Sequence, residues 1–177
     1  LEGHFILSSG LHSNQYVQCA KLLSYPKQAE TICSSLTKKI KKNYNKIDIV
    51  LSPAIGGIVV GYEVGRQLNV QTIFAERFEN KLILRRGFFI PKDSNVLIVE
   101  DVITTGKSIA ECSELLKKYQ ANMIGYACII DRSDNKVLIK EKIISQIKFK
   151  MLTFKKDELP DELKKIPAVK PGSRNLP

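Results

Sequence analysis

Two acidic residues at the end of an apolar run are the first feature of the chain that could do chemistry. Glu100 and Asp101 follow the apolar segment 96–99, and the chain continues as VITTGKS (102–108). Neighbouring carboxylates repel each other, and a Thr-Thr-Gly segment favours neither helix nor strand. A purely structural connector is rarely built in this way, so the segment indicates a binding or catalytic site.

The segment suits a phosphate on one side and hydroxyl groups on the other. Unpaired backbone N–H groups at a helix start, with the positive end of the helix dipole, bind phosphate. Gly106 permits close approach of the backbone, and Thr104, Thr105 and Ser108 can add hydroxyl donors. The carboxylates instead accept hydrogen bonds from a sugar diol, or face a cationic centre or the water shell of Mg²⁺. The pattern therefore predicts a site for a ribose 5-phosphate.

Two widespread phosphate-binding motifs are absent from the sequence. G-x-x-x-x-G-K-[ST] does not occur, although Gly106-Lys107-Ser108 mimics its end, and G-x-G-x-x-G is missing. The remaining structural interpretation is a buried strand followed by a capped polar turn. That interpretation does not explain why two acids, two threonines and a glycine occur together.

Helical and strand patterns alternate along the chain and position this segment. Apolar residues recur at helical spacing in 26–42 and 107–119, and a glycine-rich turn opens a third helix within 54–68. Short apolar runs predict strands at 47–53, 71–75, 96–100, 122–131 and 143–154. Such alternation predicts an α/β fold with a parallel sheet flanked by helices. In open parallel sheets, ligands bind beyond the carboxyl ends of the strands, where the acid pair stands.

The rest of the chain shows no repeat and no linker. The segment 76–95 is polar and basic, and we expect it to be irregular. The tail from Lys155 is expected to hold a short helix at most. We therefore predict one domain over residues 1–177.

Composition agrees with a soluble α/β domain. The chain has 177 residues, of which 44% are hydrophobic. No apolar run approaches the roughly 20 residues that a membrane span needs, and the start LEGHFILSSG lacks signal-peptide features. The four cysteines form no CxxC pair and the two histidines are too few for a metal cluster, so we expect free thiols in a reducing cytoplasm.

The formal net charge of +10 allows either a nucleic acid or a polyanionic small molecule as partner. Much of the excess lies in Lys38-Lys39, Lys41-Lys42 and the lysine-rich tail. We interpret these runs as solvated helix faces, and we expect no nucleic-acid partner.

In these motifs the sequence resembles the phosphoribosyltransferases, and within them the orotate phosphoribosyltransferases. The likeness runs along nearly the whole chain. It includes GHFILSSGLHSNQYVQC (3–19), SPAIGGIVVGYEVGRQL (52–68), AERFENKLILRRGF (75–88), VLIVEDVITTGKS (96–108) and IIDRSD (129–134). The acid-pair motif is typical of the broad family, and the segment SSGLHSNQY narrows the likeness to orotate.

The resemblance implies a phosphoribosyltransferase fold with a small N-terminal hood segment (roughly 1–25) and a mobile catalytic loop (roughly 76–88). The implied reaction transfers ribose 5-phosphate from 5-phosphoribosyl 1-diphosphate (PRPP) to orotate, in pyrimidine (UMP) biosynthesis. It requires Mg²⁺, held mainly through PRPP rather than by protein ligands. The resemblance also implies a homodimer whose mobile loop reaches the neighbouring subunit's site.

The resemblance assigns roles to individual residues. Glu100 and Asp101 bind the ribose hydroxyls, and Asp101 also stabilises positive charge at C1 as a catalytic residue. Thr104 and Arg132 contact orotate, since a guanidinium suits a planar carboxylate. The implied PRPP site comprises Glu100, Asp101, Val102, Ile103, Thr104, Thr105, Gly106, Lys107, Ser108, Arg77 and Lys81.

The loop cations and two departures from the family complete the prediction. Four cations are available for the diphosphate: Arg77, Lys81, Arg85 and Arg86. We assign Lys81 as the catalytic cation. Many orotate enzymes carry lysines where this chain has Ser8 and the segment 55–57, and the glycines there can bind diphosphate through backbone N–H groups.

Three alternatives remain open at this point. Arg132 could be a surface residue paired with Asp131 or Asp134. The chain could act on another nucleobase, since the acid pair does not distinguish among bases. It could also be a non-enzymatic regulator that retains the fold and binds nucleic acid, although no added DNA-binding domain is visible.

Overall fold

Six strands form the sheet that carries the acid pair. The computed structural model describes residues 1–7, 9–133, 139 and 141–171. The strands are β3 (Ile49–Pro53), β4 (Gln71–Phe78), β5 (Lys81–Leu84), β6 (Asn95–Ile103), β7 (Asn122–Asp131) and β8 (Ile143–Lys148), in the spatial order β5-β4-β3-β6-β7-β8. Every neighbouring pair is parallel except β4 and β5. The predicted parallel sheet is confirmed, with one antiparallel strand at its edge.

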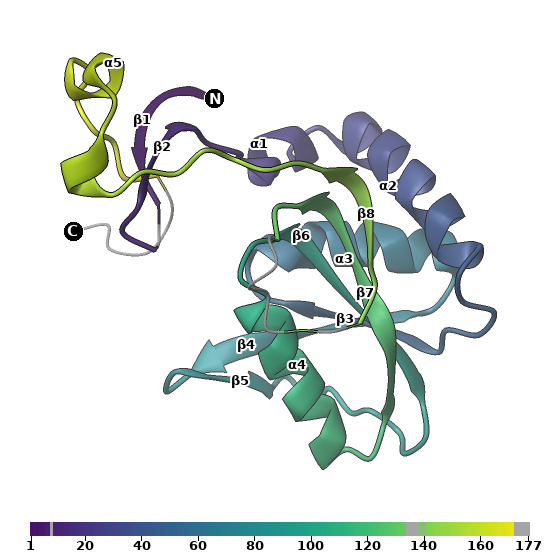
Figure 1. Cartoon of the computed structure of the whole chain (residues 1–177). Coiled ribbons are helices and arrows are strands. Elements are labelled where there is room, and N and C mark those ends of the chain that lie inside the picture. Colours follow the sequence, from purple (N-terminus) through teal and green to yellow (C-terminus); the bar gives the residue numbers. More distant parts are fainter. Residues whose placement is uncertain (8, 134–138, 140, 172–177) are drawn as a thin grey trace. The chain divides into compact units, whose positions relative to one another are not determined.

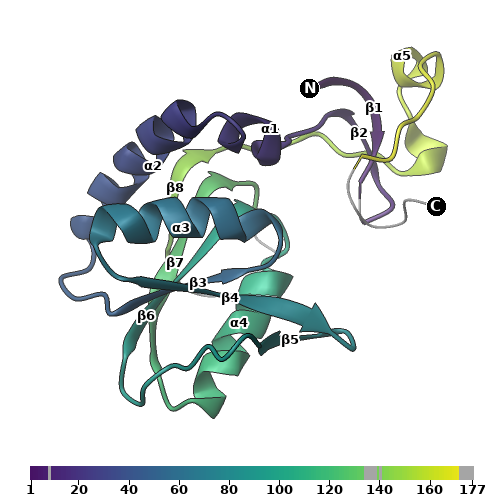
Figure 2. The ribbon, with the colours of Figure 1, turned by 180° about the vertical axis from the view of Figure 1, so that it is seen from behind.

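Helices cover both faces of this sheet (Figures 1 and 2). On one face lie α2 (Pro26–Lys41) and α3 (Gly56–Leu68), preceded by the short α1 (Cys19–Leu23), and on the other lies α4 (Lys107–Lys118). Val96–Val99 of β6 are fully buried because the central strand is covered on both sides. Pro26 occupies the first turn of α2, as its fixed φ favours.

Close packing of α3 depends on glycines four residues apart. A Cβ atom placed on Gly61 would lie 1.9 Å from Ser52 Oγ and 3.0 Å from Ser52 Cβ in β3. A Cβ atom on Gly65 would lie 1.8 Å from Thr72 Oγ1 in β4. Residues at this spacing share one helix face, so the stripe lets the α3 backbone rest directly on the sheet.

The expectation that 76–95 is irregular is wrong in its first part. Strand β4 continues to Phe78, turns through Glu79 and Asn80, and returns as β5. Both turn residues have positive φ, 45° and 63°, as two-residue hairpin turns with the twist of the flanking strands require. The charged residues that obscured the pattern are exposed on a two-stranded ribbon, and in β5 only Leu82 is buried.

The last predicted strand, 143–154, is too long. β8 ends at Lys148, and the chain from Lys150 belongs to a second compact unit. The larger unit is Cys19–Phe149, and the smaller one combines Leu1–Gln18 with the segment from Lys150 onward. Whether the two units work as one catalytic domain stays a prediction.

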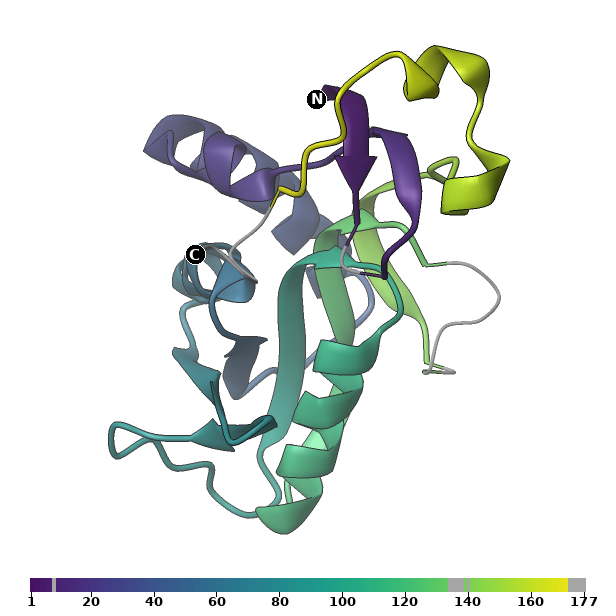
Figure 3. The same ribbon diagram turned by 90° about the vertical axis from the view of Figure 1, so that its left-hand side faces the viewer.

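The smaller unit pairs the two ends of the chain. β1 (Glu2–Ile6) and β2 (His12–Gln15) form an antiparallel hairpin, and the C-terminal segment lies beside it (Figure 3). Ile6 N–H donates to the Val169 carbonyl at 2.8 Å, and His12 and Phe154 exchange two backbone hydrogen bonds. The tail holds a 3₁₀ turn (Lys156–Glu158) and α5 (Asp161–Lys164), so the expectation of a short helix is confirmed.

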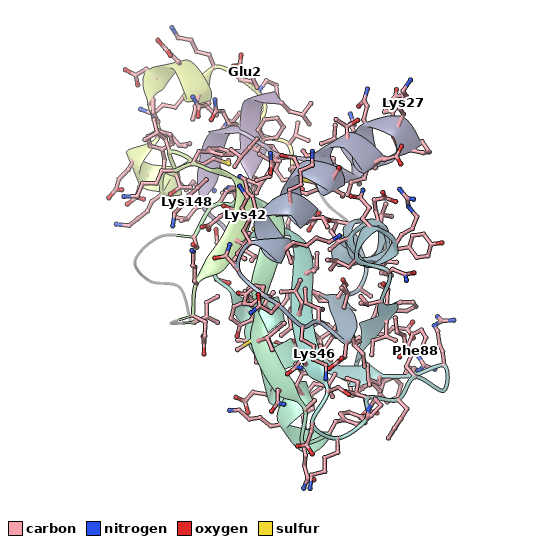
Figure 4. The ribbon with its side chains drawn as sticks, turned by 90° about the vertical axis from the view of Figure 1, so that its right-hand side faces the viewer. Glu2, Lys27, Lys42, Lys46, Phe88 and Lys148 are labelled. Atoms are coloured by element: carbon pink, nitrogen blue, oxygen red, sulfur yellow. The ribbon has the colours of Figure 1, made fainter. Side chains whose placement is uncertain are left out.

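The lysine runs of the sequence and the lengths of its apolar helices can be checked against the structure. The lysines of α2 are exposed, from Lys27 in its first turn to Lys42 just past its end (Figure 4). Lys38, Lys39 and Lys41 lie in the last turn, where the helix dipole favours cations. Among the described residues, no helix is long and apolar enough to cross a bilayer.

Candidate active site

The candidate site lies where the connections of the sheet diverge. β3 and β6 are parallel neighbours, but β3 leads through α3 to β4 on one side while β6 leads through α4 to β7 on the other. Such a switch point leaves a crevice outside the carboxyl ends of the two strands. The helices that follow them therefore begin at the same edge of the sheet.

The acid pair lies in this crevice, directly against the start of α3. Glu100 and Asp101 are part of β6, which extends beyond them to Ile103. A Cβ atom on Gly56 would lie 2.9 Å from Asp101 Oδ1, and one on Gly57 would lie 3.0 Å from Glu100 Oε1. A side chain at either glycine position would crowd a carboxylate oxygen, which would then have to shift.

Each carboxylate is held by the backbone that follows it. Asp101 N–H donates to Glu100 Oε1 at 3.2 Å, and Val102 N–H donates to Asp101 Oδ1 at 2.8 Å. Burial raises the pKa of Glu100 well above its ordinary value of 4.5, and the charge of Asp101 and a side-chain hydrogen bond with it raise it further. Both acids keep further carboxyl oxygens that can accept hydrogen bonds from a sugar diol.

The turn after β6 presents backbone donors. Gly106 has a φ of 76° and opens α4 without a side-chain cap. The first turn of α4 contains Lys107 and no acidic residue. A lysine there opposes the helix dipole, so this end keeps a positive potential that an anion would neutralise. Thr104 and Thr105 are exposed beside it.

The backbone brings Thr104 and Arg132 together. Arg132 N–H donates to the Ile103 carbonyl at 2.8 Å, which places the residue after β7 next to the residue before Thr104. Asp131 is buried, and its Oδ1 accepts from Ser133 N–H at 2.8 Å and from Ser133 Oγ–H. Lys148 pairs with the other Asp131 oxygen at 3.2 Å. Asp131 therefore shapes the turn around Arg132, and Asp134, like Ser8, lies outside the described residues.

The hairpin β4–β5 carries the loop cations, and three of them are engaged. Arg77 pairs with Glu111 of α4 at 2.6 Å, and Arg86 pairs with Glu76 across the hairpin at 2.8 Å. Arg85 lies over the ring of Phe78, 5.6 Å from its centroid. Lys81 is exposed next to the turn and has no ion-pair partner within the described part of the chain.

Other concave and polar features lie away from the acid pair. Two hollows of about 370 and 290 Å³ are lined mainly by residues of 39–47 and 142–145, beyond the C-terminal end of α2. Neither is lined by a residue of the acid pair or of the turn after it. Over the described ranges, no group of three or more His, Cys, Asp or Glu could hold a metal ion.

Comparison with known proteins decides the family. Residues 23–157 match the phosphoribosyl transferase domain model. An orotate phosphoribosyltransferase of Caldanaerobacter subterraneus is 48% identical over 175 residues, which cover 99% of this chain and 91% of the relative. One of Caldicellulosiruptor bescii is 48% identical, over 98% of this chain and 90% of the relative. The chain belongs to the orotate phosphoribosyltransferase family.

Solved structures support the fold. The orotate phosphoribosyltransferase of Aeropyrum pernix has a TM-score of 0.70 at 22% identity, and the match covers 84% of this chain and 86% of that one. The adenine phosphoribosyltransferase of Thermoanaerobacter pseudethanolicus has a TM-score of 0.65 at 19% identity, with coverage of 76% and 88%. The fold is therefore shared between phosphoribosyltransferases for orotate and for adenine.

Sequence reasoning missed the contacts of two residues that lie near the predicted site residues. Asp131 had a local signal, because an aspartate two residues before a serine is typical of a turn closed by the side chain. Glu111 had a weaker one, its position four residues after Lys107 on the same helix. Its contact with Arg77 joins segments 34 residues apart and left no mark in the sequence.

Replacing Glu100 with glutamine should stabilise the protein at high pH. Because folding raises the pKa of Glu100, the folded state holds a proton that the unfolded state releases as pH rises above 4.5. Stability is lost as pH rises from 4.5 through the folded-state pKa, and glutamine removes that loss. The melting temperature of Glu100→Gln should exceed that of the wild type by a few degrees at pH 8, with the difference shrinking toward pH 5. A difference independent of pH would contradict this explanation.

Proposed function

We propose that the protein transfers ribose 5-phosphate from PRPP to orotate, giving orotidine 5′-phosphate and diphosphate. The observation that carries the proposal is the acid pair between two helix starts at the switch point of the sheet. The two helix starts offer backbone N–H donors for two phosphate groups, and the carboxylates between them accept hydrogen bonds from a ribose diol. The family relatives, matched over nearly their whole length, support orotate as the base.

The residues divide the substrate between them. Residues 104–108 and the start of α4 bind the 5-phosphate, and the backbone N–H groups of residues 54–57 and the start of α3 suit the diphosphate. Glu100 and Asp101 bind the ribose hydroxyls. Thr104 and Arg132 bind orotate, the guanidinium pairing with its carboxylate.

The donor set near the diphosphate fits Mg²⁺ in the manner expected from the sequence. A hydrated Mg²⁺ that is held mainly through the phosphates of PRPP needs no protein cage, and the carboxylate oxygens of Asp101 can accept hydrogen bonds from its water shell. When bound, the ion neutralises charge on the leaving diphosphate.

Catalysis rests on positioning and electrostatics more than on proton transfer. The bond between C1 and the diphosphate oxygen breaks and its electron pair leaves with the diphosphate, while N1 of orotate forms the new bond to C1 and gives up its proton to the departing diphosphate. Asp101 stabilises the positive charge that develops at C1, and Lys81 stabilises the negative charge on the diphosphate. The turn holding Thr104 and Arg132 aligns N1 with C1.

The assembly and the compartment belong to the same proposal. We infer a homodimer. In it, the hairpin arm of one subunit, which is residues 76–84 of β4 and β5, reaches the active site of its neighbour. An exposed apolar stripe, formed by the N-cap residue Ile55 and by Val59 and Tyr62 of α3, supports a second copy as the occupant of that face. The four cysteines are free and buried, as expected for a protein of the reducing cytoplasm.

The test is orotate consumption, followed by its ultraviolet absorbance with PRPP and Mg²⁺ present. We expect loss of orotate that requires both reagents, and no reaction with adenine, hypoxanthine or uracil. Turnover of another base alone would keep the ribose phosphate site and overturn the base. A folded protein without turnover of any base would favour the regulator.

Lys81 should be the loop cation that matters most. We expect Lys81→Ala to lower kcat by roughly a hundredfold, because it removes a charge that acts on the leaving group. Arg85→Ala and Arg86→Ala, which remove cations engaged within the hairpin, should each cost less than tenfold. Steady-state kinetics with varied PRPP measures all three. A larger loss for either arginine would move the role to that residue.

A further inference from the structure

One ion pair joins the hairpin arm to the helix that begins at the phosphate-binding turn. Arg77 Nη2 of β4 donates to Glu111 Oε2 of α4 at 2.6 Å. The side chains are 34% and 24% exposed, so the pair is shielded more than most surface pairs. The other Glu111 oxygen lies 4.0 Å from Lys107 Nζ, in the first turn of the same helix. Glu111 thus holds one cation from the arm and one from the phosphate-binding end of α4.

The same guanidinium also reaches the tip of the arm. Arg77 Nη1 donates to the backbone carbonyl of Asn80 at 2.8 Å, and Asn80 immediately precedes Lys81. Asn80 has a left-handed backbone, so the carbonyl that Arg77 binds belongs to the turn itself. A continuous series of contacts therefore runs from α4 through Glu111 and Arg77 to the residue beside Lys81.

The second ion pair of the hairpin shows what is special about this one. Arg86 and Glu76 pair within the hairpin and can move with it as a unit. Arg77 and Glu111 connect the hairpin to a different element. A two-stranded ribbon alone is marginally stable, so its orientation depends on such outside contacts.

We propose that Glu111 is a positioning residue, which sets the orientation of the hairpin that carries Lys81 by holding Arg77. The inference rests on the proposed function and assigns Arg77 to the arm's support rather than to direct contact with PRPP. It deepens that function by naming how the arm is kept in register with α4. Glu111 itself touches no substrate.

Steady-state kinetics tests the inference. Glu111→Gln keeps the size of the side chain and removes its charge. We expect it to lower kcat/KM for PRPP roughly five- to tenfold, with little change in KM for orotate, as loss of one charge-assisted contact predicts. Arg77→Gln should cause a similar loss, and the double variant should lose no more than either single one.

A matched control lies on the same helix. Glu114 is exposed and pairs with Lys117 at the far end of α4, so Glu114→Gln should leave the kinetics unchanged. A lower KM for PRPP in Glu111→Gln would mean that Glu111 withholds Arg77 from the diphosphate, and would overturn the proposal. So would an unchanged kcat/KM, or an Arg77→Gln loss that is much larger than that of Glu111→Gln and adds to it.

Hydrogen exchange provides a readout that does not depend on the reaction. In Glu111→Gln, backbone amides of residues 76–84 should exchange several times faster than in the wild type, while amides of α2 should be unchanged. Glu114→Gln should match the wild type throughout. Unaltered exchange in the hairpin would refute the positioning role even if the enzyme acted on a base other than orotate. Faster exchange in the hairpin of Glu111→Gln, together with no turnover of any base by the wild type, would support the positioning role and contradict the proposed function.

Discussion

Asp101→Asn should lower kcat/KM for orotate phosphoribosylation by roughly two to three orders of magnitude. Removing one electrostatic stabiliser from a shielded site typically costs this much. Burial and the neighbouring Asp101 raise the pKa of Glu100, and Asp101 is the acid nearer the phosphate-binding turn. Asparagine keeps the acceptor for Val102 N–H, so the loss should come from charge and not from a collapsed turn.

The measurement is the initial rate of orotate loss at saturating Mg²⁺, with PRPP affinity from calorimetry. Affinity should fall much less than the rate, because the charge at C1 develops only in the transition state. Asp93→Asn is the matched control, since Asp93 is an exposed residue in a left-handed turn, where asparagine is well tolerated. A rate within threefold of the wild type for Asp101→Asn would remove Asp101 from the mechanism.

Gly61→Val should destabilise the protein by about 3 kcal/mol or more, because overpacking forces the helix away from the sheet. The first added carbon alone would lie 3.0 Å from Ser52 Cβ, and rotation of the serine hydroxyl does not relieve that contact. For a chain of this length we expect a fall in melting temperature of roughly 6–12 °C.

The matched control places valine at an exposed position of another helix. Gln28 of α2 is exposed, so Gln28→Val changes helix propensity without filling occupied space. Thermal and urea unfolding of both variants separates packing from propensity. Equal stabilities would show that α3 can move outward without cost, which would contradict the role given to the glycine stripe.

The large unit could be predicted from the sequence because its signals are local. Continuous apolar runs gave β3, β6 and β7, and helical spacing gave α2 and α4 to within a few residues. The hairpin was missed because an exposed ribbon does not need the apolar alternation of a half-buried sheet. The prediction of 143–154 failed because Phe154 has β-favouring character but pairs with His12 in another unit.

The site was predictable in its residue types but less so in its contacts. The family resemblance assigned the acid pair and the turn after it, and the structure brings that turn to Arg132 through the Ile103 carbonyl. The roles of these residues in binding stay predictions. The close approach of the first α3 glycines to the carboxylates of Glu100 and Asp101 depends on how distant segments pack. The ion pair between Arg77 and Glu111 depends on it as well. No local pattern encodes such contacts.

The smaller unit has a consequence for the order in which the chain is made. Its hairpin, β1–β2, is synthesised before the larger unit, but the segment that it hydrogen-bonds, around Phe154 and Val169, is synthesised after that unit. An isolated two-stranded hairpin is marginal in water, so the hairpin lacks a stabilising partner while the larger unit is being synthesised. His4 and His12, whose rings contact at 2.6 Å in the finished unit, stay exposed during that interval. All strands of the larger unit, Cys19–Phe149, are synthesised before the segment from Lys150 onward. The order of translation therefore separates the folding of the two units in time.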